Sequence, residues 1–475
     1  MENINVFEDN FNRYMLPKYG NYRDLQNDLE MTQYLNQHDY YNQYEPIIDN
    51  IRVKYHDIDV YTIDPPNCTD ADDAFSIFTK DDKLYLSIHI ADPTHYISTE
   101  STLWNDILNR VLTHYPSNYP PIHMMPDNIV RLSSLMTFYD PEVKNAISVT
   151  FEIDKETYLP TKNIKLEFTE LIVKIENRFT YKEASQLKNK DIFSKAILIS
   201  QKLKEKRSEK TVGTKLSDLN IMIPSFDNNQ IYISNVDSDE KLMKDMIGEF
   251  AILTNSYIAE FMKKNMNGLG IYRNCIADFA TNTLQEISGE EILNKIIDEG
   301  IKADYSNKDE SHDLVGIKLY THFTSPMRRV SDCICHFLIK SYFCNMESPW
   351  TQEELEEISK RCYTLTKKEK SIQYDDQKHR IIQLLYCLSR TNQIKIKFRI
   401  TGYTGLFLNC IISEIICNEK EYKVHVSYTL RNKDLRYHHQ PNKYYTIDIK
   451  TIRPIQQYDE GSLIDLDLFI YNLFF

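Results

Sequence analysis

The sequence predicts an α+β protein, because segments with the period of β-strands lie on both sides of a helical middle. Residues 84–91 alternate apolar and polar side chains, as a strand with two different faces does. Residues 241–263 carry apolar side chains at helical spacing, and residues 352–390 predict a second long helix with a charged outer face. From about residue 395 the period returns to two, which predicts a small terminal β domain.

These signals divide the chain into residues 1–50, 51–392 and 393–475. The first part is a polar N-terminal extension, in which residues 22–36 predict a short helix but no core of their own. The second part is the main domain, and the third is the terminal β domain. Further strands of the main domain are expected at 147–153 and 161–174.

The chain has 475 residues and a net charge of −13, which argues against a wholly basic nucleic-acid coat. The charge does not exclude a nucleic-acid enzyme, because a metal site is itself negative until its ions bind and a basic channel can lie inside an acidic protein. The contrast between 33 tyrosines and 11 glycines is typical of an AT-rich genome, such as a viral one, and carries no information about chemistry.

No apolar run reaches the 18 residues that indicate a membrane-spanning helix, so no membrane partner is expected. The N-terminal MENINVFEDN lacks the basic and apolar regions of a secretory signal. Nine cysteines are scattered without a CxxC pair, and the closest two, Cys333 and Cys335, lie in a segment predicted to be a buried helix. Reduced thiols in a cytoplasmic protein are the simplest interpretation, since a zinc site needs more ligands than this spacing offers.

The stretch TIDPPNCTDADDAF, residues 62–75, gathers four carboxylates: Asp64, Asp70, Asp72 and Asp73. Like charges this close raise one another's proton affinity, and divalent cations remove the conflict because Mg²⁺ prefers carboxylate and water oxygens. Two such ions about 4 Å apart would activate water and stabilise the leaving oxygen in phosphodiester hydrolysis. The alternative is a solvated acidic turn with helix-capping aspartates.

The stretch YTHFTSPMRRVSDCICHFLI, residues 320–339, predicts a helix that starts at Ser325 and Pro326. Arg328 and Arg329 would then lie in the first turn, where cations are unfavourable against the helix dipole. A bound phosphate would reverse that sign, because backbone N–H groups, dipole and guanidinium all favour an anion. The alternative is a routine ion pair between Arg328 and Asp332 one turn later.

With both stretches in view, the sequence resembles the ribonuclease II/R family, whose catalytic module is called RNB. The aspartate stretch matches the signature of that family, and HIADPTHYI within residues 81–97 continues the match. HYPSNYPPIHMMPDNI (114–129) is similar to the family's tyrosine loop, GEFAILTNSYIAEFM (248–262) to its helix with Glu and Asn, and THFTSPMRRVSDCICHF (321–337) to its arginine motif. These motifs are collinear, and they imply an RNB catalytic domain with a C-terminal OB-like β domain.

The resemblance also implies roles for individual residues. The four aspartates match the family's metal site, and Asp72, Asp73 and Arg328 are the expected catalytic residues, with catalysis depending most on Asp72. Arg328 matches the arginine that holds the reacting phosphate. The residues expected to bind RNA are Arg328, Arg329, Tyr115, Glu249 and Glu369. Tyr115 falls at the tyrosine that stacks on terminal bases, whereas both glutamates match less closely and have a helix-surface role as the alternative.

The chain departs from the family pattern at Val330, where most members have Tyr, and before residue 51, where there is no room for two OB-type RNA-binding domains. RNA capture is therefore expected to be weaker or supplied by a partner protein. The function implied is 3′–5′ exoribonuclease activity on single-stranded RNA, with Mg²⁺, or Mn²⁺ in its place, and nucleoside 5′-monophosphates as products. The alternatives are an inactive RNB-type RNA-binding module and another metal-dependent nuclease, such as a DNA nuclease.

Overall fold

The main sheet has five strands in the order β1-β6-β5-β4-β3. Its strands are β1 (Val53–Tyr55), β3 (Asp73–Lys80), β4 (Lys83–Ala91), β5 (Val143–Ile153) and β6 (Pro160–Ile172). All neighbours are antiparallel except β1 and β6. In the computed structural model the described residues are 7–20, 42–135, 143–227, 230–233, 237–404, 407–431, 442–449, 452–453 and 467–468. The three strand predictions are therefore confirmed, and the helix expected at 22–36 lies outside the described residues.

The two faces of β4 are both buried, but they differ in chemistry. The apolar face, which includes Leu86 and Ile88, packs against helices in the first hydrophobic core. On the other face His89 lies between two hydroxyls, with Nδ1 2.7 Å from Ser148 Oγ and Nε2 3.0 Å from Ser76 Oγ. Burial lowers the pKa of His89 to about 3, so this imidazole is neutral and serves as a hydrogen-bonding group of the sheet.

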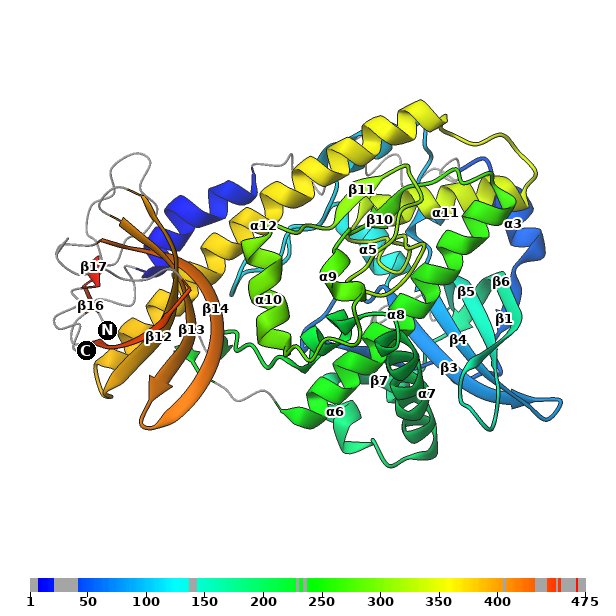
Figure 1. The fold of residues 1–475 in the computed structure, drawn as a ribbon. Coiled ribbons are helices and arrows are strands. Elements are labelled where there is room, and N and C mark those ends of the chain that lie inside the picture. The colour runs from blue at the N-terminus through cyan, green and yellow to red at the C-terminus, as the bar shows by residue number, and fades with distance from the viewer. Residues whose placement is uncertain are drawn as a thin grey trace.

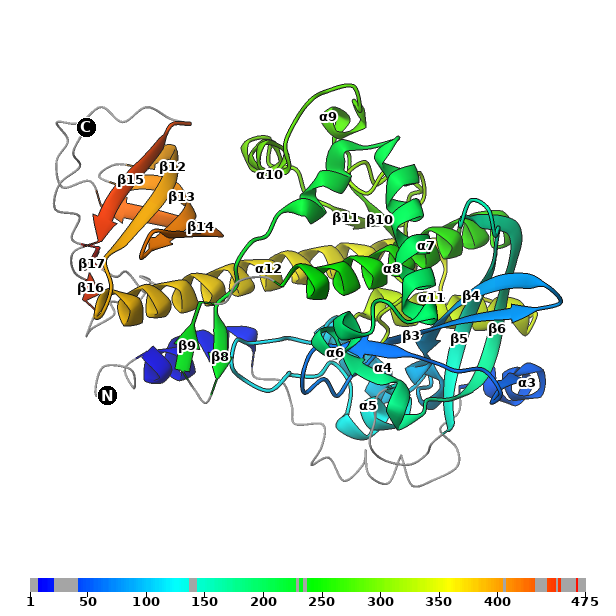
Figure 2. The same cartoon turned by 90° about the horizontal axis from the view of Figure 1, so that it is seen from below.

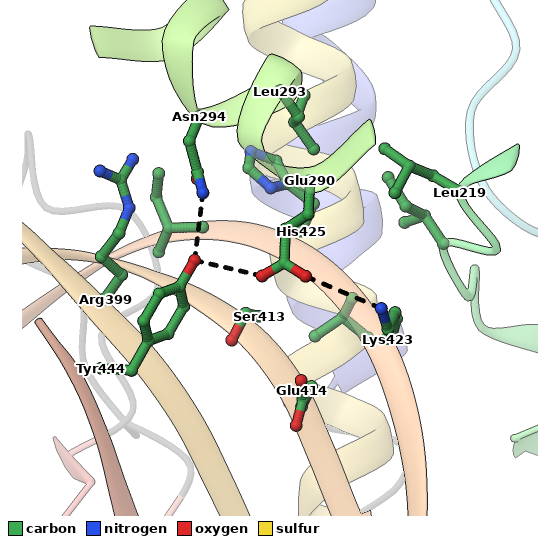
Figure 3. Close-up of a pocket in the computed structure, with 13 residues that line it drawn as sticks. Leu219, Glu290, Leu293, Asn294, Arg399, Ser413, Glu414, Lys423, His425 and Tyr444 are labelled. Carbon is green, nitrogen blue, oxygen red and sulfur yellow. Dashed lines mark hydrogen bonds and ion pairs between the residues drawn. The ribbon is translucent and has the colours of Figure 1, made fainter. Parts of the chain in front are cut away.

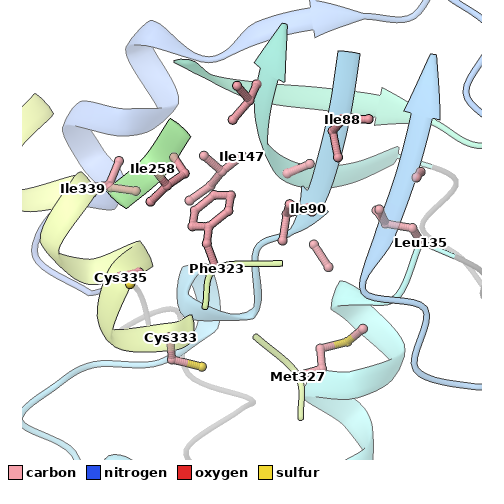
Figure 4. Packing of buried hydrophobic residues seen from close by; sticks show 14 of the residues in the cluster. Ile88, Ile90, Leu135, Ile147, Ile258, Phe323, Met327, Cys333, Cys335 and Ile339 are labelled. Carbon is pink, nitrogen blue, oxygen red and sulfur yellow. The ribbon is translucent and has the colours of Figure 1, made fainter. Parts of the chain in front are cut away.

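Helices cover the apolar face of the sheet (Figures 1 and 2). Phe75 of β3 contacts Phe193 and Phe250, which belong to α7 (Asp191–Ser208) and α8 (Ser238–Asn265). The helix α11 (Val330–Phe343) lies deepest, with every residue from Val330 to Ser341 buried. In Figure 4 its Cys333, Cys335 and Ile339 lie on one side of Phe323, and the strand residues Ile88 and Ile90 lie on the other. The apolar spacing in 241–263 is thus confirmed as a core-facing helix.

Shorter elements complete the structure of the chain before α11. The helices are α3 (Glu45–Ile51), η4 (Pro93–Tyr96), α4 (Thr102–Arg110), α5 (Asp127–Ser133), η5 (Ile175–Asn177), α6 (Tyr181–Gln186), η6 (Val212–Asp218), α9 (Asp278–Thr281) and α10 (Gly289–Asp298). Two-stranded pairs are formed by β2 (Thr62–Asp64) with β7 (Arg178–Thr180), β8 (Ser225–Asp227) with β9 (Gln230–Tyr232), and β10 (Tyr272–Asn274) with β11 (Asp304–Ser306).

All nine cysteines are free thiols. Within the described part of the chain, no helix is both long and apolar enough to cross a bilayer.

The helix α12 (Gln352–Ser389) joins two hydrophobic cores. It has 38 residues, so at 1.5 Å per residue it is roughly 57 Å long. Leu355 and Cys362 near its start belong to the first core. Ile381 and Leu385 near its end belong to a second core, which also contains Phe7, Phe11, Met15, Ile394, Phe398 and Val426. The helix predicted at 352–390 is confirmed.

The terminal β domain is an antiparallel sheet in the order β14-β13-β12-β15. Its strands are β12 (Ile394–Thr404), β13 (Phe407–Cys417), β14 (Lys420–Arg431) and β15 (Tyr444–Ile449), and β16 (Ile452–Arg453) pairs with β17 (Asp467–Leu468). The sheet meets α10 through polar contacts: Tyr444 Oη donates to Glu290 (Figure 3). In addition, Arg399 pairs with Asp298 at 3.1 Å. The period-two prediction is confirmed as a sheet, whereas the OB-like barrel stays a prediction.

A buried ionic cluster ties α3, the end of β4 and α11 together. Lys340 of α11 is fully buried and pairs with Glu45 and, at 2.9 Å, with Asp92. Arg52 pairs with Glu45 at 3.1 Å, and His95 Nδ1 lies 2.7 Å from the same carboxylate. Two carboxylates and two cations therefore balance in a dry site, in which each charge is compensated only while its partners remain. This arrangement gives the Asp92 of the HIADPTHYI motif a structural role.

Replacing Lys340 with Met should destabilise the fold by about 3–5 kcal/mol, because Arg52 is then the one Lys or Arg that the described residues place beside the two buried carboxylates. Urea unfolding followed by circular dichroism measures the loss. The matched control is Lys360→Met, which breaks an exposed pair with Glu356 and should leave the unfolding midpoint unchanged. Equal midpoints for the two variants would contradict the structural role of the cluster.

Candidate active site

Four aspartates are brought together where β2 ends and β3 begins. Asp64 is the last residue of β2, Pro65 and Pro66 turn the chain away from the strand, and Asp73 is the first residue of β3. The loop between them is fixed by main-chain bonds: the Ala91 N–H donates to the Asp72 carbonyl at 2.8 Å. In addition, Leu135 N–H donates to the Ala71 carbonyl and Ala71 N–H to Ser134 Oγ. The carboxylates are therefore held on a rigid loop.

Burial dominates the electrostatics of this cluster. It raises the pKa of Asp72 to about 8 and that of Asp73 to about 6, although the nearby Arg328 guanidinium acts in the opposite direction in both cases. The pKa of Asp64 is raised well above its usual range, first by burial and then by the negative charges of the other three aspartates. Shifts of this kind, in a cluster that the chain holds rigid, are typical of functional sites.

Asp72 is bound by two donors from the arginine motif, 255 and 256 residues away in the sequence. The Met327 N–H donates to Oδ1 at 2.9 Å, and Arg328 Nε donates to Oδ2 at 3.1 Å. Arg328 Nη2 also donates to Ser325 Oγ at 2.7 Å. The side chain of Arg328 stays 44% exposed, so its guanidinium is fixed at one edge and open to solvent elsewhere. The structure thus brings the predicted catalytic arginine to the predicted catalytic aspartate.

The helix start predicted at Ser325 is wrong, because α11 begins at Val330. Ser325 does not cap the helix. Its N–H donates instead to Asp332 Oδ1 at 2.8 Å, and residues 326–328 form a turn that faces Asp72. Arg329 precedes the helix in extended conformation, and its Nη2 donates to Asp332 Oδ1 at 2.8 Å. The alternative pairing of Arg328 with Asp332 is wrong as well, since Asp332 is the partner of Arg329.

Tyr115 also reaches the aspartate cluster. Its hydroxyl donates to Asp70 Oδ2 at 2.5 Å, and the residue is 40% exposed. Cys68, which the sequence did not single out, lies in the same loop with Sγ 3.6 Å from Asp70 Oδ1 and 3.8 Å from Asp64 Oδ1. His123 Nδ1 is 4.0 Å from Asp70 Oδ2. Cys68 could have been found as part of the aspartate motif, whereas nothing in the sequence distinguishes His123.

The two glutamates have protein partners outside the aspartate cluster. Glu249 on α8 is buried and pairs with Arg207, whose Nη1 also donates to the Val315 carbonyl. Glu369 on α12 is buried against His114, with Oε2 2.5 Å from Nδ1. Glu369 therefore lies beside the tyrosine loop and Glu249 does not. The RNA contacts expected of both remain predictions, and the helix-surface alternative is wrong because both side chains are buried.

The donor set of the cluster fits a divalent cation. Asp64 Oδ2 is buried and has no hydrogen-bond partner among the described residues, so a cation would satisfy it. Hard oxygen donors in a group of four carboxylates match the preference of Mg²⁺ or Mn²⁺. Among the described residues, Glu45, Asp49 and His95 form the one group of possible ligands whose atoms all lie within 4.8 Å of one another, but Glu45 and His95 belong to the structural ionic cluster described above.

Comparison with known proteins agrees with this geometry. Residues 52–345, more than half of the chain, match the RNB domain, and the chain therefore belongs to the RNB family. Ribonuclease R of Chlamydia muridarum is 27% identical over an alignment of 324 residues, and the match covers 60% of this chain and 45% of that protein. The chain spans about half the length of the curated relatives that it matches.

Two solved structures show the same fold at low sequence identity. RNase R of Mycoplasma genitalium, in complex with ribose-methylated single-stranded RNA, matches with a TM-score of 0.66 and 18% identity, covering 90% of this chain and 75% of that chain. Yeast Ssd1, described as a pseudonuclease, matches with a TM-score of 0.62 and 14% identity, covering 89% and 57%. At these identities the likeness concerns the fold, and one of the two proteins with this fold is not a nuclease.

The raised pKa values predict how pH and metal act on stability. A carboxyl with a folded pKa above its unfolded value of about 3.9 stabilises the fold at low pH, and that contribution is lost as pH rises through the folded pKa. In metal-free protein Asp73 and Asp72 should therefore become destabilising as pH rises through about 6 and about 8. Mg²⁺ should raise the melting temperature more at pH 8 than at pH 6, because at pH 8 fewer protons must leave the aspartates before the cation can bind.

Thermal unfolding in Mg²⁺ and in EDTA at both pH values measures this difference. Asp64→Asn should lose most of the Mg²⁺ effect, since it removes a carboxylate of the cluster. Asp59→Asn is the control, because Asp59 is half-exposed and pairs with Lys174 on the surface. A Mg²⁺ effect of equal size at the two pH values would contradict the assignment of the cation to this cluster.

Proposed function

We propose that this chain is a 3′–5′ exoribonuclease that hydrolyses single-stranded RNA to nucleoside 5′-monophosphates with Mg²⁺, or with Mn²⁺ in its place. The observation that carries the proposal is the Asp72–Arg328 contact inside a group of four aspartates. Anionic ligands for a cation and a half-exposed guanidinium for a phosphate stand side by side there. Membership of the RNB family and the RNA complex of a structural relative support RNA as the substrate.

In this proposal each side chain has one task. Asp64, Asp70, Asp72 and Asp73 would hold Mg²⁺, which when bound lowers the pKa of its water and neutralises charge on the phosphate. Arg328 binds a non-bridging oxygen of the terminal phosphodiester. Its bonds to Asp72 and Ser325 hold the guanidinium in one orientation, so its solvent-exposed N–H groups keep a fixed direction. Water attacks phosphorus and gives up a proton to solvent, the bond to the 3′-oxygen of the preceding nucleotide breaks, and that oxygen takes up a proton from solvent and leaves as a 3′-hydroxyl. The phosphate therefore stays on the 5′-oxygen of the released nucleotide.

Tyr115 and Arg329 support that chemistry in different ways. The Tyr115 ring is half-exposed beside Asp70, where it can stack on a terminal base, a contact worth roughly 1–3 kcal/mol. Arg329 is bound to Asp332 and shapes the turn that carries Arg328. A partner protein that captures RNA remains part of the proposal.

The second candidate is an inactive RNB module that binds RNA, and the observation in its favour is the likeness to the pseudonuclease Ssd1. Against it, the four aspartates and Arg328 are all present and in mutual contact or charge interaction. A DNA nuclease is the third possibility. A single assay separates the three: 5′-labelled RNA, the same RNA with a blocked 3′ end, and DNA of the same sequence, each incubated with Mg²⁺.

The expected result is stepwise shortening of the open RNA, little action on the blocked RNA and none on DNA. Asp72→Asn should reduce this turnover by about 100-fold or more, a loss of about 2.7 kcal/mol. The substitution places an amide N–H₂ at one of the two carboxylate oxygens, which now accept from Met327 and Arg328, and it removes a negative charge from the site. RNA affinity, measured by filter binding, should stay equal or rise because that charge no longer repels phosphate.

Asp59→Asn again serves as the control and should keep wild-type turnover. Near-normal turnover in Asp72→Asn would sink the assignment of the site. RNA binding without any shortening in the wild-type chain would favour the inactive module, and cleavage of DNA would favour the third possibility.

Arg328→Lys and Arg329→Lys should separate the two arginines. Arg328→Lys should reduce the single-turnover rate strongly with little loss of RNA binding, because the single nitrogen of Lys cannot occupy the separate positions from which Nε and Nη2 donate to Asp72 and Ser325. Arg329→Lys keeps a cation beside Asp332, so its rate per folded enzyme should change little while its melting temperature falls. Both variants are compared at saturating Mg²⁺. A larger rate loss in Arg329→Lys would mean that the two roles are exchanged.

A further inference from the structure

Residues 7–19 lie along the second half of α12, as the dark-blue segment of Figure 2 shows. They form η1 (Phe11–Met15), a short π-helical turn, and η2 (Leu16–Tyr19). Phe11, Met15 and Tyr19 recur every four residues and are all buried. Phe11 and Met15 pack in the second core. Tyr19 lies outside that core and contacts the loop of residues 113–119 through His114. This segment is therefore packed into the structure and is not a free extension.

Tyr19 is joined to that loop through one carboxylate of α12. Its hydroxyl donates to Asp376 Oδ2 at 2.7 Å, and the same oxygen accepts the Ser117 N–H at 2.8 Å. Arg380, one turn further along α12, donates from Nη2 to the Ser117 carbonyl at 3.0 Å. Both main-chain polar groups of Ser117 are thus fixed by α12, and one of the two fixing groups is itself oriented by Tyr19.

A second contact reaches the same loop three residues earlier. The Tyr19 ring packs against the His114 ring, with centroids 5.8 Å apart and an angle of 62° between the planes. His114 is held from its other side by Glu369. Burial raises the pKa of Tyr19, so its hydroxyl keeps the proton that it donates to Asp376.

Tyr115 lies between these two anchors, followed by Pro116, and its hydroxyl donates to Asp70 in the aspartate cluster. His114 and Ser117 fix the backbone on either side, so the direction in which Tyr115 points follows from how they are held. A continuous series of contacts therefore runs from the N-terminal segment, through Tyr19 and Asp376, to the loop that ends on an active-site carboxylate.

We propose that Tyr19 is a positioning residue for the reaction: it holds the 113–119 loop so that Tyr115 meets Asp70 and the terminal base. The inference rests on the proposed exoribonuclease function. It assigns the N-terminal segment to the active-site architecture, although this segment precedes the residues that match the RNB domain. Tyr19 acts through Tyr115, so its effect should disappear when Tyr115 cannot respond.

Tyr19→Phe in the full chain is the test, because it removes one hydroxyl and keeps the buried ring. The matched control is Lys18→Met, which breaks the neighbouring surface pair with Asp375 and leaves the loop contacts in place. In hydrogen exchange, amides of 113–119 should lose protection in Tyr19→Phe and keep it in Lys18→Met. The single-turnover rate at saturating Mg²⁺ and RNA should fall about fivefold, the effect of one lost hydrogen bond, with RNA affinity little changed.

A double-mutant cycle with Tyr115→Ala distinguishes positioning from general stability. Tyr115→Ala alone should slow the reaction at least as much as Tyr19→Phe and leave longer final oligonucleotides, and adding Tyr19→Phe should then slow the reaction no further. Additive losses, or unchanged loop protection and rate in Tyr19→Phe, would overturn the inference. A wild-type chain that leaves RNA intact would instead overturn the proposed function, and the exchange data would still decide whether Tyr19 holds the loop.

Discussion

The contact between Asp72 and the Met327–Arg328 turn is the constraint on which the rest of the site depends. It joins segments more than 250 residues apart, and it opposes, without cancelling, the rise in the pKa of Asp72 that burial causes. The turn can present two donors to Asp72 only because α11 begins later than its sequence indicates. Asp332 at the start of that helix accepts from Ser325 and Arg329, which leaves Arg328 free to face the aspartates.

The two hydrophobic cores explain how such a site can be stable. Four neighbouring carboxylates destabilise the loop that carries them, and that loop is fixed by β3, β4 and the main-chain bonds to residues 91 and 135. Beneath it lies α11, whose buried Lys340 is compensated by Glu45 and Asp92. Because α12 contributes to both cores, its two ends are fixed, and its middle supplies Glu369 and Asp376 to the tyrosine loop.

The sequence was sufficient for the elements with clear periodicity and for the place of the aspartate cluster in the chain. The alternation in β4 and the long apolar spacing of α8 are local properties, and the four aspartates lie within one short loop. The start of α11 was wrong because Ser-Pro is a good helix start in isolation, whereas here Asp332 takes the Ser325 N–H and the turn serves Asp72. The partners of Glu249 and Glu369 depend on tertiary contacts, with Arg207 and His114, that no local pattern encodes.

Each polar group of the site is oriented by a neighbouring residue that is itself fixed. Arg328 is oriented by Asp72 and Ser325, and Tyr115 by a loop that α12 holds at Ser117. Catalytic geometry of this kind tolerates little looseness, because a displacement of about 1 Å can cost 100-fold in rate. A residue far from the aspartates, such as Tyr19, therefore contributes to the geometry of the site when its series of contacts ends on an active-site group.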